Sequence, residues 1–274
     1  MSQNTPDPHE HTRFLAMSRA RIRLLRYLDN TPQSPRELAS ALSLSRRGIQ
    51  RNLSKLVERG WAKKVNGAYR LTTNGKLITE QYVDFRTTVG IIHECKPFFE
   101  YLPDCDHVPA PEWLHDAEIF VATSDQPHAP IRQYVNGLKN SSPTTVRSLL
   151  PVLSQYYTDL YVELTERGAE IELVVDETVL KSDSVQSLAV SASGSSPESI
   201  VLHESPQPID FGLTLSDHCG FMSAYDERGR IRACIECDDP AFLNWAVELY
   251  QNYRNGARTV NSGEIIPRKG DPVG

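Results

Sequence analysis

The sequence predicts a multi-domain α/β protein, with an N-terminal winged helix-turn-helix and a C-terminal α/β domain. Residues 34–71 show helix caps, a tight turn, a basic helix and a short hairpin, in the order that a winged helix requires. After residue 112, apolar runs typical of buried strands alternate with helical patterns, which indicates parallel strands joined by crossover helices. The parts we expect are a disordered tail (1–17), a winged helix (18–75), a linking or dimerisation helix (76–102), an α/β domain (112–258) and a second disordered tail (259–274).

The first helix of the helix-turn-helix begins at Ser34. This serine can accept free backbone N–H groups, Pro35 suits the first helical position, and Glu37 completes a capping box. The segment Ser43–Ser45 then forms the turn, and Ser45 is placed to cap the next helix. An earlier helix, ending near residue 30, is expected to complete the domain.

The second helix carries apolar residues on one side and cations on the other. Residues at i, i+4, i+7 and i+8 predict a buried stripe of Ile49, Leu53, Leu56 and Val57. Arg47, Arg51 and Lys55 share the opposite face, where three stacked cations repel one another in water. A polyanion would make this arrangement favourable, so the helix is interpreted as a recognition helix for DNA.

A β-hairpin follows this helix. Asn66-Gly67 is the pair best suited to a two-residue type I′ turn, because both positions need positive φ. The hairpin would form a short wing whose cations can reach phosphate or the minor groove. The residues expected to contact DNA are Ser45, Arg46, Arg47, Gln50, Arg51, Lys55, Lys63, Lys64 and Arg70.

The distribution of charge separates the two parts of the chain. Residues 1–83 contain 15 Lys plus Arg and 6 Asp plus Glu, a net charge of +9, within a chain whose net charge is −6. The remaining residues therefore carry −15, so only the N-terminal part is expected to approach nucleic acid. The chain shows no secretory signal and no run of membrane-spanning length, and its five cysteines form no disulfide framework, which predicts a cytoplasmic protein.

The helix after the wing has an apolar seam. Its members alternate at steps of four and three, which is coiled-coil spacing: Ile78, Tyr82, Phe85, Val89 and Ile92. We expect this seam to form a homodimer, although packing within the same chain is the competing interpretation. A dimer would place two recognition helices on half-sites about 34 Å apart.

Polar residues follow three predicted strands of the α/β domain. Because ligands of open α/β sheets bind outside the carboxyl ends of strands, an effector site is expected there. Its candidate residues are Ser124, Asp125, Ser154, Asp176 and Glu177, which suit a polyol, amine or cation better than a phosphate, unless they only cap helices and form turns.

Several segments resemble archaeal regulators related to the methanogenesis regulatory protein FilR. They include the segments at 95–102, 116–119, 150–154, 172–176 and 211–213, and the final segment at 245–250. This resemblance implies a DNA-binding transcriptional regulator whose second domain senses a small ligand. The chain is also distantly similar to TrmB-type regulators, whose sensory domain resembles a phospholipase D half.

Phospholipase D chemistry needs a His nucleophile with Lys two residues later, and none of the eight histidines has one. The α/β domain therefore resembles a non-catalytic phospholipase D half, and we expect no enzyme activity and no cofactor. Two alternatives remain: a winged-helix protein-interaction module without specific DNA binding, and a metal or redox sensor using Cys234 and Cys237. A zinc site from His93, Cys95, Cys105 and His107 has poor geometry, because residues 93 and 95 of one helix point about 200° apart.

Overall fold

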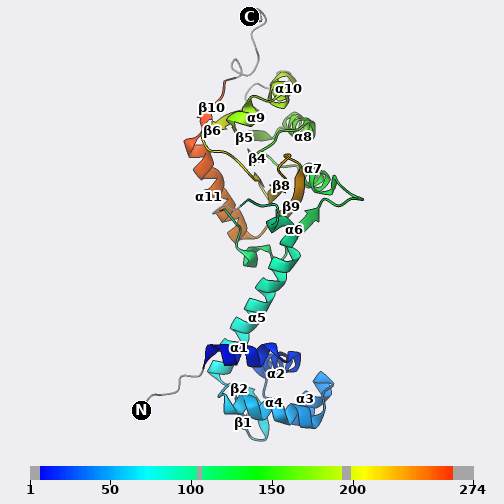
Figure 1. Ribbon diagram of the computed structural model, residues 1–274, viewed down its shortest axis with the longest axis vertical. Coiled ribbons are helices and arrows are strands. Elements are labelled where there is room, and N and C mark those ends of the chain that lie inside the picture. Colours follow the sequence, from blue (N-terminus) through cyan, green and yellow to red (C-terminus); the bar gives the residue numbers. More distant parts are fainter. Residues whose placement is uncertain (1–6, 104–106, 193–198, 262–274) are drawn as a thin grey trace, which may run out of the picture. The chain divides into compact units, whose positions relative to one another are not determined.

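The structure is a computed structural model that describes residues 7–103, 107–192 and 199–261. The chain divides into two compact units, residues 1–90 and residues 91–274 (Figure 1). Unit 1 contains the winged helix and unit 2 contains the α/β domain, so both parts of the predicted fold class are present.

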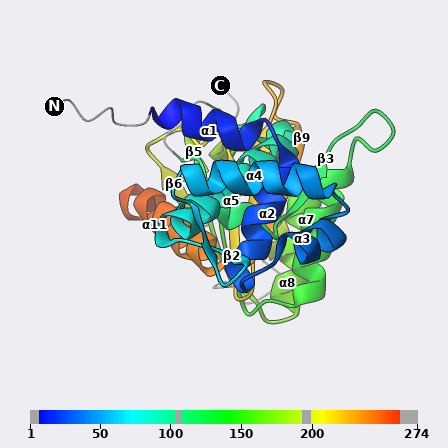
Figure 2. The same cartoon turned by 90° about the horizontal axis from the view of Figure 1, so that it is seen from below.

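Unit 1 follows the helix and strand order of a winged helix. Its elements are α1 (Pro8–Ala16), α2 (Arg19–Asn30), α3 (Pro35–Leu42), α4 (Arg46–Glu58), β1 (Ala62–Val65), β2 (Ala68–Leu71) and the start of α5 (Thr73–Glu94). A short turn joins α3 to α4 (Figure 2). Its residue Ser43 adopts the left-handed conformation, with φ of 54°, which ends α3 sharply.

The predicted helix caps are confirmed. The backbone N–H of Glu37 donates to Ser34 Oγ at 3.3 Å, and the backbone N–H of Ser34 donates to Glu37 Oε2 at 2.7 Å. These reciprocal bonds are a capping box, and they lower the pKa of Glu37. Ser45 Oγ accepts from the backbone N–H of Gly48 at 3.1 Å, so α4 begins where the sequence predicts.

The predicted wing is also confirmed. Asn66 and Gly67 have φ of 49° and 84°, and Val65 pairs directly with Ala68, so the turn has two residues. Gln33 adds backbone hydrogen bonds to Tyr69 of β2, at 2.8 and 2.9 Å. The hairpin is thereby fixed to the segment that leads into α3.

The core of unit 1 corrects two predictions. Val57 is 41% exposed, although it was expected in the buried stripe with Ile49, Leu53 and Leu56, which are fully buried. Successive residues of an α-helix are rotated by about 100° around its axis, which places Val57 outside the arc that Ile49, Leu53 and Leu56 occupy. The expected disordered tail of residues 1–17 is wrong for residues 7–17, because α1 forms there and buries Phe14 and Leu15; residues 1–6 lie outside the described residues.

Unit 2 is built on an eight-stranded sheet in the order β10-β6-β5-β4-β7-β8-β9-β3. Strands β4, β5 and β6 are parallel, and β7, β8, β9 and β3 continue the sheet by antiparallel pairing. Parallel strands with an antiparallel extension are therefore confirmed. The strand bounds are β3 (Glu118–Val121), β4 (Thr145–Leu150), β5 (Glu170–Asp176), β6 (Ile200–Ser205), β7 (Gly212–Ser216), β8 (Gly220–Tyr225), β9 (Ile231–Cys237) and β10 (Arg258–Thr259).

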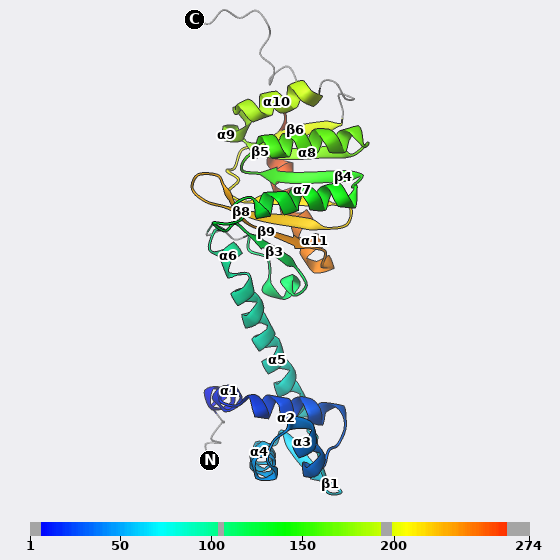
Figure 3. The ribbon, with the colours of Figure 1, turned by 90° about the vertical axis from the view of Figure 1, so that its right-hand side faces the viewer.

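Helices cover both faces of this sheet (Figures 1 and 3). One core lies under α7 (Ala129–Ser141), α8 (Gln155–Glu166), α9 (Glu177–Leu180) and α10 (Asp183–Ala192). The other lies under α6 (Lys96–Phe99), the 3₁₀ helix η1 (Pro111–Leu114) and α11 (Pro240–Gly256). Neighbouring residues of a central strand serve opposite cores: Leu150 belongs to the first and Leu149 to the second.

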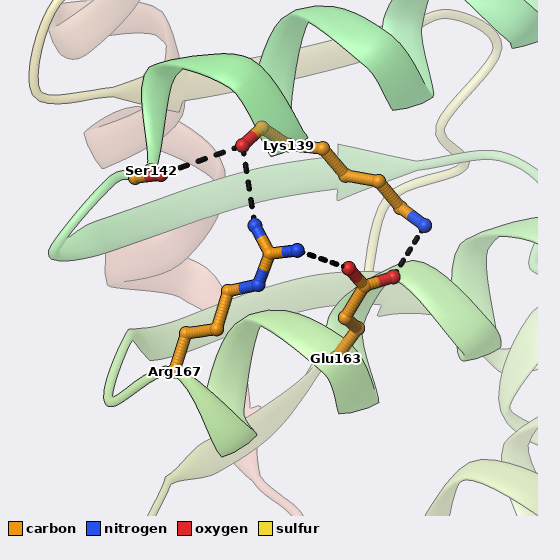
Figure 4. A network of polar contacts seen from close by, with 4 residues as sticks. All are labelled: Lys139, Ser142, Glu163 and Arg167. Atoms are coloured by element: carbon orange, nitrogen blue, oxygen red, sulfur yellow. Dashed lines mark hydrogen bonds and ion pairs between the residues drawn. The ribbon is translucent and has the colours of Figure 1, made fainter.

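A polar cluster joins α7 to α8 (Figure 4). The Glu163 carboxylate of α8 accepts from Lys139 of α7 and from Arg167, and Arg167 also donates to the Lys139 carbonyl at 3.3 Å. The hydroxyl of Ser142 donates to the same carbonyl at 3.4 Å. The bond from Lys139 is the main reason that the pKa of Glu163 is lowered. The cluster fixes the C-terminal ends of the two helices, so their N-terminal ends are held at the opposite edge of the sheet.

The connecting segments are more ordered than the sequence indicates. The linking helix starts at Thr73 rather than residue 76 and stops at Glu94, and Phe98 of the following α6 is fully buried. At the C-terminus, β10 pairs with β6 and Val260 is 7% exposed, so the predicted tail is wrong at its first residues; residues 262–274 lie outside the described residues.

We expect Gly75→Ala to destabilise the winged helix. A Cβ at residue 75 would lie 1.9 Å from the backbone oxygen of Trp61, so the backbone must shift. Overpacking of this kind lowers the free energy of unfolding by about 1–3 kcal/mol. The control is Gly90→Ala in the same helix, where nothing lies within 4 Å and the higher helix propensity of Ala adds about 0.5–1 kcal/mol. Urea denaturation measures both, and wild-type stability in Gly75→Ala would contradict the close approach.

Candidate functional site

The exposed face of α4 is cationic. Arg46, Arg47, Gln50 and Arg51 are all exposed, and among the described residues none of these arginines forms an ion pair with a carboxylate. Lys55 is only half-buried, one turn further along the helix. The Ser45 cap fixes the first turn, which carries Arg46 and Arg47, at the end of the helix that offers free N–H groups. The face therefore combines guanidinium groups with the positive end of a helix dipole.

The wing adds a second cationic surface. Lys63 of β1 lies directly opposite Arg70 of β2, and both side chains are exposed. Like charges in directly opposed positions of an antiparallel pair are destabilising, so this pair gains from an anion placed between or beside them. Lys64 points to the other side of the hairpin, with its Nζ 5.9 Å from the centre of the Tyr69 ring.

Sequence reasoning missed the residues that fix α1 to the rest of unit 1. The Phe14 ring lies between the guanidinium carbons of Arg21 and Arg59, each 3.9 Å from the ring centre. Arg21 also donates to the Phe14 carbonyl, and its Nε lies 3.4 Å from Oδ1 of Asn52 in α4. Burial is the main cause of the lowered pKa of Arg21. The available signal was Asp7-Pro8, a cap residue followed by a proline in the first helical position.

The predicted dimerisation seam divides into two parts. Ile78 and Tyr82 pack partly against the core of unit 1, as the competing interpretation expects. Phe85, Val89 and Ile92 are instead 59%, 48% and 44% exposed. These three residues are spaced by four and three and form an apolar stripe on α5, which we call the α5 stripe.

The five candidate effector residues do not form one site. All follow strands whose carboxyl ends share one edge of the sheet, but Asp176 caps α9 at 2.9 Å and Glu177 pairs with Lys181 at 2.5 Å. Ser124 and Asp125 follow β3, the edge strand, and line neither of the two cavities described next. The alternative that such residues mainly cap helices and form turns therefore describes Asp176 well.

Two cavities open at this edge. The larger, of about 970 Å³, is lined by Asp176 and by charges of both signs from the turn between β8 and β9, among them Asp226, Glu227 and Arg228. The smaller, of about 370 Å³, lies between the N-termini of α7 and α8 and includes Ser154. We call the smaller one the α7–α8 cavity.

The cysteines do not support a metal or redox site. Cys234 and Cys237 are three apart on β9, so they point into opposite cores of the sheet. Burial raises the pKa of Cys234 to about 12 and that of Cys237 to about 11, which favours inert thiols. Cys95 is buried while His93 is exposed, and Cys105 lies outside the described residues. Within the described ranges, no three His, Cys, Asp or Glu side chains are grouped to hold a metal ion.

No helix of the described part of the chain is both long enough and apolar enough to cross a membrane.

These features define a winged-helix transcription regulator that carries a second, α/β domain. Residues 9–94 match the HVO_A0261 N-terminal domain, and residues 127–256 match the middle domain of methanogenesis regulatory protein FilR1. The resemblance to FilR-related archaeal regulators is confirmed by these two matches. No curated protein sequence matches the chain.

Solved structures resemble parts of this fold. Nuc, a phospholipase D family member from Salmonella typhimurium, is 14% identical over 53% of this chain and 97% of its own, with a TM-score of 0.43. TrmBL2, an archaeal chromatin protein, is 14% identical over 93% of this chain and 100% of its own, with a TM-score of 0.38. The reduced form of MarR from E. coli is 31% identical over 27% of this chain and 56% of its own, with a TM-score of 0.24. At these TM-scores, the likenesses carry no functional argument.

We expect Ser45→Ala to destabilise the recognition helix. The substitution leaves the Gly48 N–H without its side-chain acceptor, and loss of an N-cap costs about 1 kcal/mol of unfolding free energy. Ser54→Ala is the control, because Ser54 is exposed in the interior of the same helix and alanine is the better helix former there. Circular dichroism during urea denaturation measures both, and equal stabilities would contradict the role given to Ser45.

Proposed function

We propose that the protein is a cytoplasmic, sequence-specific DNA-binding regulator that acts as a homodimer and senses a small ligand through unit 2. One observation carries the DNA-binding part: Arg46, Arg47 and Arg51 of α4 and the cations of the wing are exposed without carboxylate partners among the described residues, on a fold whose recognition helix is capped. Repulsion between such cations is relieved when phosphates replace water, and release of counterions adds to the binding free energy.

Each cation has an expected role. Arg46, Arg47 and Gln50 lie in the first turns of α4, where recognition helices meet base edges, so we assign them to base contact. Arg51 and Lys55 lie further along α4 and are assigned to phosphates. Ser45 caps the helix and presents its first turn. The wing residues Lys63, Lys64 and Arg70 are assigned to phosphate or the adjacent minor groove.

The α5 stripe supports the dimer. Three exposed apolar side chains on one helix face lose contact with water when a second α5 packs against them. In a parallel coiled coil of two α5 helices, Gln81 of one helix would lie next to Arg86 of the other, beside the apolar seam. No like charges would meet there. A second copy of this chain is therefore the partner that the stripe fits, and a two-fold axis would match the symmetry of a palindromic operator.

Unit 2 is proposed to bind rather than to catalyse. The sequence lacks the His and Lys spacing of phospholipase D chemistry. The four described cysteines are free and buried, which suits a reducing cytoplasm. A cavity that binds without cutting is what a sensory domain requires.

The alternative is a protein-interaction module that uses the winged fold without specific DNA binding. Its basic face would bind an acidic partner and show no preference among DNA sequences. Selection of genomic fragments by the purified protein, followed by sequencing, separates the two functions. Enrichment of a two-fold symmetric motif supports the regulator, whereas binding that only fades with salt supports the module.

We expect Arg47→Ala and Arg51→Ala to weaken DNA binding in different ways. Loss of a base contact at Arg47 should cost about 1–3 kcal/mol on the selected motif and relax discrimination at one position. Loss of a phosphate contact at Arg51 should weaken binding to all sequences alike and reduce the slope of log affinity against log salt by about 1.

Titrations of motif and random duplexes at several salt concentrations measure these effects. Lys181→Ala is the control, because this exposed cation belongs to unit 2 and pairs with Glu177. Equal losses on motif and random DNA for Arg47→Ala would contradict base contact by that residue.

We expect Val89→Glu to separate the dimer. A carboxylate in the centre of the α5 stripe must lose its hydration when two helices pair, which should raise the dimer dissociation constant at least about tenfold. Thr87→Glu places the same charge on another face of α5, at an exposed position, and should leave the dimer intact. Sedimentation equilibrium measures both variants. A wild-type dissociation constant in Val89→Glu would mean that the chain dimerises elsewhere, and a monomeric wild-type protein would contradict the dimer itself.

A further inference from the structure

The α7–α8 cavity differs from its larger neighbour in the sign of its charge. Among the described residues, its lining contains two arginines, Arg230 and Arg232, and no carboxylate. The larger cavity is lined by five carboxylates, which are Glu100, Asp176, Asp210, Asp226 and Glu227. A volume of about 370 Å³ lies in the range of small-molecule sites. A ligand of this cavity would therefore meet positive groups only.

Arg232 is the arginine available to a ligand. It lines the cavity and forms no ion pair with a carboxylate among the described residues, and its guanidinium carbon lies 5.1 Å from the centre of the Tyr101 ring, which lines the larger cavity. A guanidinium without a carboxylate partner is available to an anionic ligand. Arg230 is already engaged, because its Nε and a terminal nitrogen contact Asp226 at 2.9 and 2.8 Å.

The two helices that open onto the cavity add to its positive character. His128 and Ser154 are the N-cap residues of α7 and α8, and neither side chain makes a capping hydrogen bond. In the first turn of α7, Pro130 has no N–H group and the N–H of Ala129 donates to the Gln126 carbonyl at 3.3 Å, so α8 offers more free N–H groups than α7. The positive ends of both helix dipoles point to the same edge of the sheet. Together with Arg232, these groups favour an anion.

The remaining walls are aromatic and uncharged. The hydroxyl groups of Tyr157 and Tyr225 lie 2.8 Å apart in a hydrogen bond, and burial raises the pKa of both, so they remain neutral. At the mouth, the Tyr156 ring is 58% exposed and its centre lies 6.4 Å from that of the His128 ring. Ile131 and Val152 complete an apolar lining. Such walls fit a flat ring and reject a polyol, whose hydroxyl groups would find few partners.

We propose that the α7–α8 cavity binds an aromatic carboxylic acid of the arylacetate type, with its carboxylate on Arg232 and its ring between the tyrosines. The proposal rests on the proposed sensory role of unit 2 and names the class of its ligand. It replaces the polyol, amine or cation expected from Ser124, Asp125, Asp176 and Glu177, of which none lines this cavity. Only Ser154 of the original candidates belongs to it.

Isothermal titration calorimetry of the full chain tests the ligand class with three compounds of nearly equal shape. Indole-3-acetate is an anion, indole-3-acetamide is neutral and tryptamine is a cation at neutral pH. The expected result is that the acid binds at least about tenfold more tightly than the amide, since a hydrogen bond to a charged group is stronger than one to a neutral group, and that tryptamine does not bind.

Variants test the assigned residues. Arg232→Gln should abolish the preference for acid over amide, and Arg232→Lys should retain part of it. Tyr156→Ala should weaken acid and amide by the same factor, because it removes a ring and no charge. Arg228→Gln is the matched control, since Arg228 lies on the turn that leads into β9 and lines the larger cavity only, and its affinities should equal those of wild type.

Equal affinities for acid and amide, an unchanged preference in Arg232→Gln, or no binding of any of the three compounds would each overturn the proposal. DNA binding is measured separately, by titration of the selected motif with and without indole-3-acetate. An acid that binds through Arg232 but leaves DNA affinity unchanged supports the cavity assignment and contradicts the sensory role. A failure to bind any DNA motif contradicts the proposed function of unit 1 and leaves the cavity result standing.

Discussion

The burial of the central strands on both faces is the constraint on which unit 2 depends. Residues 149 and 150 of β4 face opposite cores, and residues 173 and 174 of β5 do the same. A strand in that position has no solvated face, so the polar groups that a ligand can reach lie where the strands end. The Glu163 cluster fixes one end of α7 and α8, and the other ends then frame the α7–α8 cavity.

Unit 1 meets the opposite constraint, because its function requires charge to remain exposed. The wing places Lys63 against Arg70, and α4 holds three exposed arginines in its first two turns, although each arrangement is unfavourable in water. Other interactions must offset this repulsion. The capping bonds of Ser34 and Ser45, the Gln33–Tyr69 bridge and the stacking of Arg21 and Arg59 on Phe14 supply them. The exposed cations of α4 and the wing can therefore remain unpaired on the face proposed to meet DNA.

Local signals predicted most of the fold and little of the second site. The local signals are the helix caps, the Asn66-Gly67 turn and the helical periodicity, and each acts over a few residues. The elements of unit 1 and the parallel and antiparallel strands of unit 2 were therefore predictable. Tertiary packing decides which distant residue a side chain contacts, and the periodicity of the sequence carries no information about such contacts. Phe85 and Tyr82 look equivalent in the seam, yet only Tyr82 packs on the core of unit 1. Arg232 gave no signal, because its role depends on Tyr156 and Tyr157, more than seventy residues away in sequence.

The charge of unit 2 decides how such a cavity can select its ligand. The part of the chain after residue 83 carries a net charge of −15, so its long-range field repels anions. This repulsion is screened over about 8–10 Å at physiological ionic strength, whereas contacts inside a desolvated cavity are screened much less. An anion therefore gains nothing from steering and binds only if Arg232, the helix N-termini and the aromatic walls act together at short range. The same field disfavours contact between unit 2 and DNA, which leaves the basic face of unit 1 as the surface that nucleic acid meets.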